Sequence, residues 1–272
     1  MPAQSPVKLR AEAEERSAPP ASVVYEAIYL EGKDELERET SALFFSALAA
    51  GLSMGFSLIT EALLRAALPD TPWRVLICKL GYAVGFLIVV LARQQLFTEN
   101  TLTVMLPLLH WKNHFVLAKV GRLWAIVLTG NLVGALLMGW VLGHSPVFDA
   151  QIKSVMMEIS RQGNEDPFLT VLLRGVFAGW LIALMVWLMP AAQSARVAVI
   201  VIITYLVALA GLAHVIAGSV DKLLLVTTSN LSWGAYLGGF LAPALLGNII
   251  GGVSLVAALN HGAAGREQAS QS

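Results

Sequence analysis

The feature that most constrains this chain is a loop-and-helix module that occurs twice, about 116 residues apart, within apolar sequence of membrane length. The first copy carries Leu-Phe-Thr-Glu at 96–99 and then Asn131 within Gly-Asn-Leu-Val-Gly. The second carries His214 and then Asn248 within Gly-Asn-Ile-Ile-Gly. Bilayer interiors tolerate irregular backbone only where protein buries it or where it lines a water-accessible path. Paired interruptions in two halves of a membrane protein indicate a solute site near the midplane. The pattern therefore predicts a transport protein, with the two asparagines acting in packing within the repeats.

The composition independently favours a membrane protein. Hydrophobic residues make up 57% of the chain, charged residues 13%, and the mean hydropathy is +0.70, whereas an ordinary soluble domain is roughly 25% charged. The formal net charge is zero, which argues against a nucleic-acid partner. The single cysteine, Cys78, permits neither an intramolecular disulfide nor a cysteine-based metal cluster. We expect no metal and no cofactor.

The apolar segments predict six spans, since about 20 residues cross the hydrocarbon core. The second span is expected to be interrupted at 93–98 and the fifth at 214–219. Three spans per repeat is an odd number, so the second copy must be inverted relative to the first. The predicted fold is an all-α membrane protein, a six-span bundle of two inverted three-helix repeats with the second and fifth helices broken. The spans are expected at 41–68, 74–110, 119–143, 167–189, 196–228 and 233–259.

Small residues within these spans are expected where helix backbones approach closely. The glycines expected there are Gly134, Gly139, Gly247, Gly251 and Gly252.

Three parts of the chain are distinguished by composition. Residues 1–40 are polar and charge-rich and are interpreted as a cytoplasmic N-terminal segment, disordered over about the first fifteen residues, with a short solvated helix at 31–40. Residues 41–260 form the transmembrane domain, and 261–272 a cytoplasmic tail. With the N-terminus inside, ten Lys and Arg residues fall on the cytoplasmic side and seven opposite, which favours cytoplasmic termini.

Sequence motifs for other chemistries are absent. The chain has no Gly-Lys-Ser/Thr phosphate loop, no Gly-x-Ser-x-Gly element and no His-Glu-x-x-His metal motif. An intramembrane enzyme would have to use His214 with Thr98, yet no activated nucleophile and no oxyanion donors accompany them. The sequence therefore predicts that the protein is not an enzyme.

The order and spacing of these elements resemble the formate/nitrite transporter family over residues 41–260. The resemblance rests on Leu-Phe-Thr at 96–98, Gly-Asn-Leu-Val-Gly at 130–134, His-Val-Ile-Ala at 214–217 and Gly-Asn-Ile-Ile-Gly-Gly at 247–252. The sequence from Arg93 through Leu-Phe-Thr-Glu-Asn-Thr resembles the YfdC-like branch of that family. The resemblance implies an aquaporin-like fold, a homopentamer in a bacterial inner membrane with a pore through each protomer, and transport of a small monovalent anion or its protonated acid, such as formate or nitrite.

The same resemblance implies roles for individual residues. His214 would be the central pore histidine and Thr98 its hydroxyl partner. A histidine changes charge near neutral pH, so it can exchange a proton with a passing weak acid. The alternative is that His214 only satisfies backbone groups where the helix breaks. Other pore positions would be Leu96 and Phe97 at the inner constriction, Tyr82 and Phe86 on the second span, and Val207, where the family often has Phe.

The chain also departs from the family pattern. Gly179 aligns with a pore-facing asparagine, and the stretch 163–166 contains no counterpart of the family's outer-mouth lysine. Glu99 is added directly after the threonine. It either forms a buried structural pair with Arg93 or faces the pore and disfavours anions. The alternatives to an anion path are a channel for a neutral small solute or a monovalent cation, and a non-conducting family member.

Overall fold

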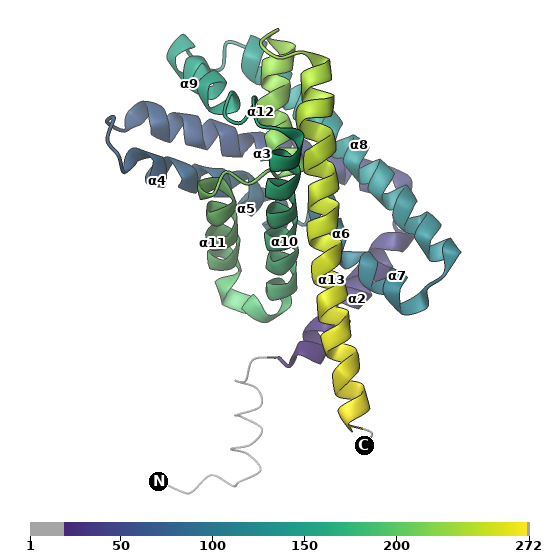
Figure 1. Ribbon diagram of the computed structural model, residues 1–272. Helices are drawn as coiled ribbons and strands as arrows, with labels where there is room; N and C mark the ends of the chain where they lie inside the picture. Colours follow the sequence, from purple (N-terminus) through teal and green to yellow (C-terminus); the bar gives the residue numbers. More distant parts are fainter. Residues whose placement is uncertain (1–18, 271–272) are drawn as a thin grey trace, which may run out of the picture.

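The computed structural model describes residues 19–270, with side chains up to 259, and the regular secondary structure of this part is entirely helical (Figure 1). The expected disorder of the first fifteen residues lies outside the described residues. The first half contains α2 (Ala21–Glu37), α3 (Thr40–Ala67), α4 (Arg74–Cys78), the 3₁₀ turn η1 (Lys79–Tyr82), α5 (Ala83–Leu91), α6 (Phe97–Thr103), α7 (Met105–Trp111) and α8 (His114–His144). The second half contains α9 (Ala150–Ser160), α10 (Phe168–Ala192), η2 (Gln193–Ala195), α11 (Arg196–Leu209), α12 (Val215–Thr227), the π-helical segment η3 (Ala235–Leu241) and α13 (Ala242–Ser270).

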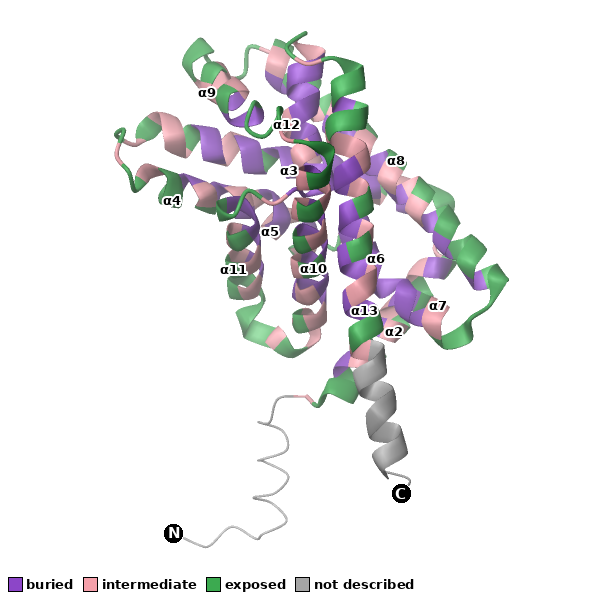
Figure 2. Cartoon of the chain, in the orientation of Figure 1, coloured by how far each residue is buried: buried purple, intermediate pink, exposed green. Residues whose placement is uncertain are grey.

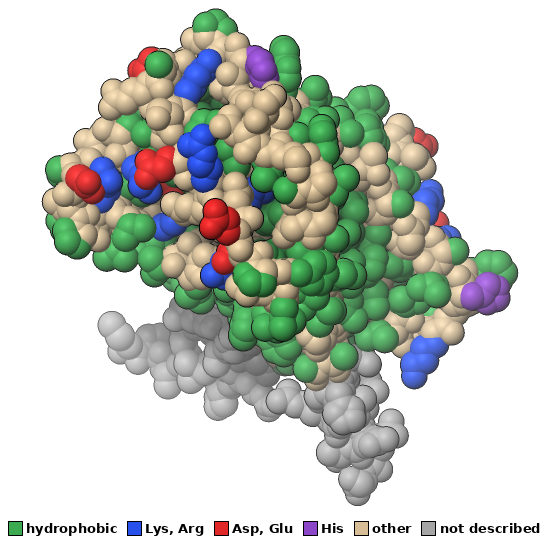
Figure 3. Space-filling model, turned by 45° about the horizontal axis from the view of Figure 1, so that its top comes forward, with side chains coloured by type: hydrophobic (Ala, Val, Ile, Leu, Met, Phe, Trp, Pro, Cys, Tyr) green, Lys and Arg blue, Asp and Glu red, His purple; other side chains and the backbone are tan. Residues whose placement is uncertain are grey.

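Five helical segments of the described chain are long and apolar enough to cross a bilayer, judged by length and composition. One of them, Phe168–Leu209, is a hairpin, because α10 and α11 lie side by side and η2 joins them (Figure 1). Apolar side chains cover a broad area of the face shown in Figure 3, as expected for a lipid-facing protein. The chain is an all-α, multi-pass membrane protein. The five segments are Thr40–Ala67, Arg74–Leu91, His114–His144, Phe168–Leu209 and Ala235–Leu259.

The helical path is interrupted twice, as the sequence predicted. Residues 92–96 separate α5 from α6, and residues 210–214 separate α11 from α12. Each interruption contains a residue in the left-handed region, Arg93 at φ 52° and Gly211 at φ 60°. The second break comes earlier than expected, because residues 215–219 already belong to α12 and His214 directly precedes that helix.

Glycines bring α3 against α8 and α10 against α13. A Cβ on Gly134 would lie 2.4 Å from the Leu48 carbonyl oxygen, and one on Gly251 would lie 2.1 Å from that of Val176. Neither site has room for a side chain, so the backbones are in direct contact. All five glycines expected at close contacts lie against another helix: Gly134, Gly139, Gly247, Gly251 and Gly252.

Helix α2 differs from the expected solvated helix at 31–40. It begins at Ala21 and buries one residue per turn, namely Val24, Ile28, Gly32 and Leu36 (Figure 2). A Cβ on Gly32 would lie 2.1 Å from the Thr103 carbonyl oxygen, so this face packs tightly on α6. The charged residues of the opposite face hid the apolar repeat in the sequence. At the other terminus the helical backbone of α13 continues to Ser270, into the predicted tail.

Candidate functional site

The Thr98 side chain contacts the His214 ring at the centre of the molecule. Thr98 Oγ1 and His214 Nε2 lie 2.7 Å apart, and both residues are buried. The His214 ring also caps α12, because its Nδ1 accepts the Ala217 N–H at 3.1 Å. Since Nδ1 acts as an acceptor, the hydrogen of the neutral ring resides on Nε2 and is donated to Thr98. The contact expected between these two residues is therefore present, and so is the backbone role that was its alternative.

An aromatic ring packs against the His214 ring beside this contact. The Phe86 ring lies 4.9 Å from the His214 ring, edge to face at 80°, and Phe86 is fully buried. Thr98 is held from the other direction, because Thr101 Oγ1 donates to its carbonyl oxygen at 2.7 Å. The His214 ring is thus held by its two hydrogen-bonding contacts and by Phe86, and the Thr98 backbone is held by Thr101. We call Phe86, Thr98 and His214 the central layer.

Asn131 holds the first interruption in place from α8. Its Oδ1 accepts the Phe97 N–H at 2.9 Å, which is the first free N–H of α6. Its Nδ2 donates to the carbonyl oxygens of Gln95 and Ala47, each at 2.8 Å. The side-chain amide of Asn131 therefore forms hydrogen bonds to backbone groups of the loop, of the start of α6 and of helix α3.

Asn248 does the same for the second interruption from α13. Its Oδ1 accepts the Val215 N–H at 2.9 Å, and its Nδ2 donates to Ala213 O at 2.8 Å and Gly175 O at 2.9 Å. The expected packing role of the two asparagines takes this form. The hydrogen bonds also set the register of the repeats, since His214 is equivalent to Leu96.

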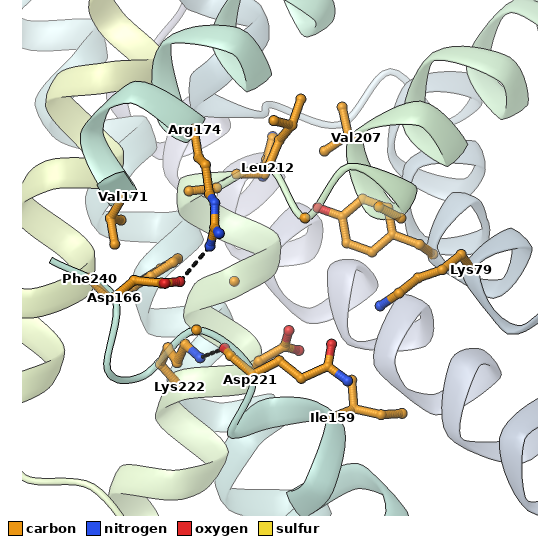
Figure 4. A pocket seen from close by; sticks show the side chains of 18 of the residues that line it. Lys79, Ile159, Asp166, Val171, Arg174, Val207, Leu212, Asp221, Lys222 and Phe240 are labelled. Carbon is orange, nitrogen blue, oxygen red and sulfur yellow. Dashed lines mark hydrogen bonds and ion pairs between the residues drawn. The ribbon is translucent and has the colours of Figure 1, made fainter. Parts of the chain in front are cut away.

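A cavity of about 170 Å³ lies on one side of the central layer, under α9, and we call it the α9-side cavity (Figure 4). His214, Tyr82 and Val207 contribute to its wall. In Figure 4 the side chain of Arg174 points into it from above and that of Lys79 from the right. Its charged lining consists of Glu61, Lys79, Asp166, Arg174, Asp221 and Lys222.

Most of these charges are paired. Lys79 Nζ lies 2.5 Å from Glu61 Oε1 in a largely buried ion pair, and Arg174 binds Asp166. Lys222 Nζ donates to two backbone carbonyls at the end of α9 and beyond it, at 2.8 and 2.6 Å. Among the described residues, Asp221 forms no hydrogen bond and no ion pair within 4 Å.

The second cavity, of about 490 Å³, lies beside α2 and is called the α2-side cavity. Leu96 and Glu99 line it together with Gln94. The Oε1 atom of Glu99 and that of Gln94 are buried and have no hydrogen-bond partner in the described part of the chain. The two cavities therefore each contain a carboxylate without a counter-ion.

Of the two alternatives for Glu99, the buried pair with Arg93 is not formed. Arg93 binds Glu31 of α2 at 2.7 Å, and its side chain is 76% exposed. The reason is that α2 folds back over this loop, which brings Glu31 to a surface position where an ion pair keeps part of its hydration. Glu99 is left facing the cavity.

One further expectation is corrected by packing. A Cβ on Gly179 would lie 2.3 Å from Asn248 O, so Gly179 faces α13 and lines neither cavity. The ring of Phe97 packs on the ring of Trp124, with 5.7 Å between the ring centroids. The place of Phe97 at an inner constriction stays a prediction.

Sequence reasoning missed the charges of the α9-side cavity. Lys79 and Lys222 were among the seven Lys and Arg residues counted in the connections opposite the cytoplasmic side, and Asp221 was not singled out. The available signal was an Asp-Lys pair within the apolar second half of the fifth span, because ionisable residues at membrane depth generally face a partner or a cavity.

The fold and the site together define a membrane transport protein, with a buried polar contact between two cavities. The chain belongs to the formate/nitrite transporter family, which matches residues 22–262. It is therefore a transport protein and not an enzyme.

Named relatives and solved structures agree with this membership. The chain is 38% identical to the inner membrane protein YfdC of Escherichia coli over 248 residues, 91% of this chain and 80% of that protein. It is 26% identical to the formate channel BtFdhC of Bacillus thuringiensis over 213 residues, 76% of this chain and 80% of that protein. A pentameric formate channel with formate bound has a TM-score of 0.67 at 22% identity, covering 80% of this chain and 94% of that one. An ion channel of the same family has a TM-score of 0.65 at 21% identity, covering 87% and 93%. These two structures show the shared fold.

Proposed function

We propose that the protein is a channel or transporter for a small monovalent anion of the formate and nitrite class, which crosses the central layer as its protonated acid. The single observation that carries the proposal is the 2.7 Å contact between Thr98 and His214, buried between two cavities. The relative named as a formate channel and the related structure with formate bound support the substrate class.

The chemistry of the central layer favours a neutral solute. A charge that leaves water for an apolar layer loses hydration, at a cost of several kcal/mol unless it is paired. The Phe86 ring supplies no such partner, whereas the Thr98 hydroxyl does supply a hydrogen-bonding group. Because the His214 Nε2–H donates to Thr98 Oγ1, the Thr98 hydroxyl hydrogen is left to donate to an oxygen of the solute.

The same proposal extends to the architecture. The matched hydrogen bonds of Asn131 and Asn248 support two inverted three-span repeats of the aquaporin-like type, with α4–α7 and α11–α12 as the broken spans. The pentameric relative supports a homopentamer, and YfdC supports a bacterial inner membrane. The Lys and Arg distribution supports cytoplasmic termini, which would place the α2-side cavity on the cytoplasmic side.

Flux into liposomes tests the proposal. The purified protein is reconstituted, and entry of formate, nitrite, acetate, a neutral solute and a monovalent cation is compared between neutral and acidic pH. We expect formate entry to be weak at neutral pH and to rise as the pH falls, because the neutral acid becomes more abundant. Fast formate entry at neutral pH, or no entry of any weak acid, contradicts the proposal.

A second candidate is a path for a monovalent cation. The observation that favours it is Glu99, whose Oε1 is buried in the α2-side cavity without a partner. Cation entry that is lost in Glu99→Gln would favour this candidate over the weak-acid path.

A further inference from the structure

We propose that Glu99 and Asp221 are proton-exchange sites, one in each cavity, that deliver a proton to the permeating anion and take it back on the other side of the central layer. The proposal rests on the weak-acid path proposed above. It assigns the proton transfer to two carboxyl groups and leaves His214 as a neutral hydrogen-bonding residue.

Glu99 has no counter-ion in the α2-side cavity. The charged groups that line this cavity with it are Glu31 and Glu35 of α2, Arg38 directly after α2, Arg93 of the loop and Arg196 at the start of α11. Arg93 is bound by Glu31 and Arg38 is bound by Glu35. Arg196 is exposed, and the structure shows no ion pair between it and Glu99. Glu99 lines the cavity, and its Oε1 is buried without a hydrogen-bond partner in the described part of the chain.

Asp221 occupies the corresponding place in the α9-side cavity, two turns into α12 from His214 (Figure 4). The other titratable and charged groups around this cavity are Glu61 of α3, Lys79 and Tyr82 of η1, Asp166, Arg174 of α10, His214, and Lys222 of α12. The cations are occupied elsewhere, since Lys79 binds Glu61, Arg174 binds Asp166, and Lys222 binds two backbone carbonyls.

A carboxylate that is enclosed at membrane depth without a donor or counter-ion is stabilised by binding a proton. The exchange needs no other reactant than water. The carboxyl O–H breaks, its proton forms a new O–H bond on the solute carboxylate, and the site is left as a carboxylate that takes a proton from solvent.

The ring of His214 is poorly placed to do the same. Its Nδ1 accepts the Ala217 N–H. A second ring proton would have to sit on Nδ1 and would place two N–H groups against each other. The geometry therefore holds His214 neutral. Within the described residues, the carboxyls of Glu99 and Asp221 line these cavities without a hydrogen-bond or ion-pair partner on the Glu99 Oε1 atom or on the Asp221 side chain.

Infrared spectroscopy tests the sites without any transport. At neutral pH we expect a C=O stretching band of protonated carboxylic acid in the wild-type protein, with a separate component lost in Glu99→Gln and in Asp221→Asn. Glu165→Gln is the control, because Glu165 is exposed and lines neither cavity. A spectrum unchanged by both cavity substitutions overturns the assignment, even if the protein transports weak acids.

Transport of the same variants tests the role. At neutral pH we expect acid-driven proton entry into liposomes to fall roughly 100-fold in Glu99→Gln and in Asp221→Asn. At acidic pH, where the solute arrives protonated, entry should approach that of the wild type and of Glu165→Gln. Equal losses at every pH indicate a structural role and overturn the proposal, as does unchanged entry at neutral pH. A cation current abolished by both substitutions also overturns it, in favour of a cation path.

Discussion

Leu96 and His214 occupy equivalent positions in the two halves of the chain. Each is the last extended residue before a short helix, at φ −109° and ψ 125° for Leu96 and φ −91° and ψ 120° for His214. In each case the next backbone N–H donates to an asparagine, Asn131 or Asn248. The two backbones are alike, but only His214 caps its helix with its own side chain. The repeat therefore positions the two short helices in the same way, and the His214 side chain adds a polar group at the start of the second one.

Replacing His214 with Phe or Asn separates its two roles. Phe removes both the Thr98 contact and the helix cap, whereas Asn keeps a capping oxygen. We expect both variants to assemble and both to lose solute flux. Phe should additionally lower the unfolding free energy by about 1 kcal/mol. Flux assays and thermal unfolding of the purified variants measure the two effects, and normal flux in either variant would remove His214 from the mechanism.

Replacing Asn131 or Asn248 with Ala should destabilise the protein strongly and to a similar extent. Each substitution leaves one backbone N–H and two carbonyls without their partner, at roughly 3 kcal/mol in total. Asn164→Ala, in an exposed loop, is the matched control and should leave the thermal unfolding midpoint unchanged. Clearly unequal losses at the two asparagines would argue against equivalent roles.

Gly179→Ala should disrupt the contact between α10 and α13 without altering a cavity wall. The added Cβ would lie 2.3 Å from Asn248 O, and we expect a loss of about 1–3 kcal/mol. Gly121→Ala is the control, because no atom lies within 4 Å of its Cβ position and alanine favours a helix. If Gly179→Ala changed solute selectivity at normal stability, the residue would face the pore after all.

The ion pair between Glu61 and Lys79 is expected to contribute through its burial. The side chains are only 5% and 15% exposed, and removing one partner leaves a buried charge, at about 3–5 kcal/mol. Glu61→Gln combined with Lys79→Met should cost less than the two single losses added together. Lys119 and Glu37 form an exposed pair at the same 2.5 Å, so Lys119→Met should not shift unfolding measurably. Additive losses at Glu61 and Lys79 would exclude coupling.

The contact of α2 with the rest of the protein should depend on pH through Glu35. Burial raises the pKa of this carboxyl above its ordinary 4.5, against the lowering effect of Arg38. A raised pKa contributes stability that is complete below pH 4.5 and is lost as the pH rises through the folded-state value. Glu35→Gln cannot ionise, so its stability relative to wild type should increase as the pH is raised from 4 to 7. A difference that stays constant or shrinks over this range would contradict the assignment.

The sequence by itself determined the features that depend on local patterns. Apolar length set the spans, and the repeated Gly-Asn motifs at 130–134 and 247–251 marked where helices meet, because backbones approach closely only at small residues. The pairing of Thr98 with His214 was also predicted, through the family resemblance. The helical face at 24–36 was present in the sequence but was obscured by the charges between its apolar positions.

Only the tertiary structure decided which partner each side chain faces. Successive helix positions differ by about 100° around the axis, so a helix must be placed before a residue can be assigned to a cavity or to a contact. For this reason Gly179 was expected in the pore and instead packs on Asn248. Arg93 binds Glu31, which lies far away in the sequence. Asp221 became a candidate site only when its cavity was formed by elements from both halves of the chain.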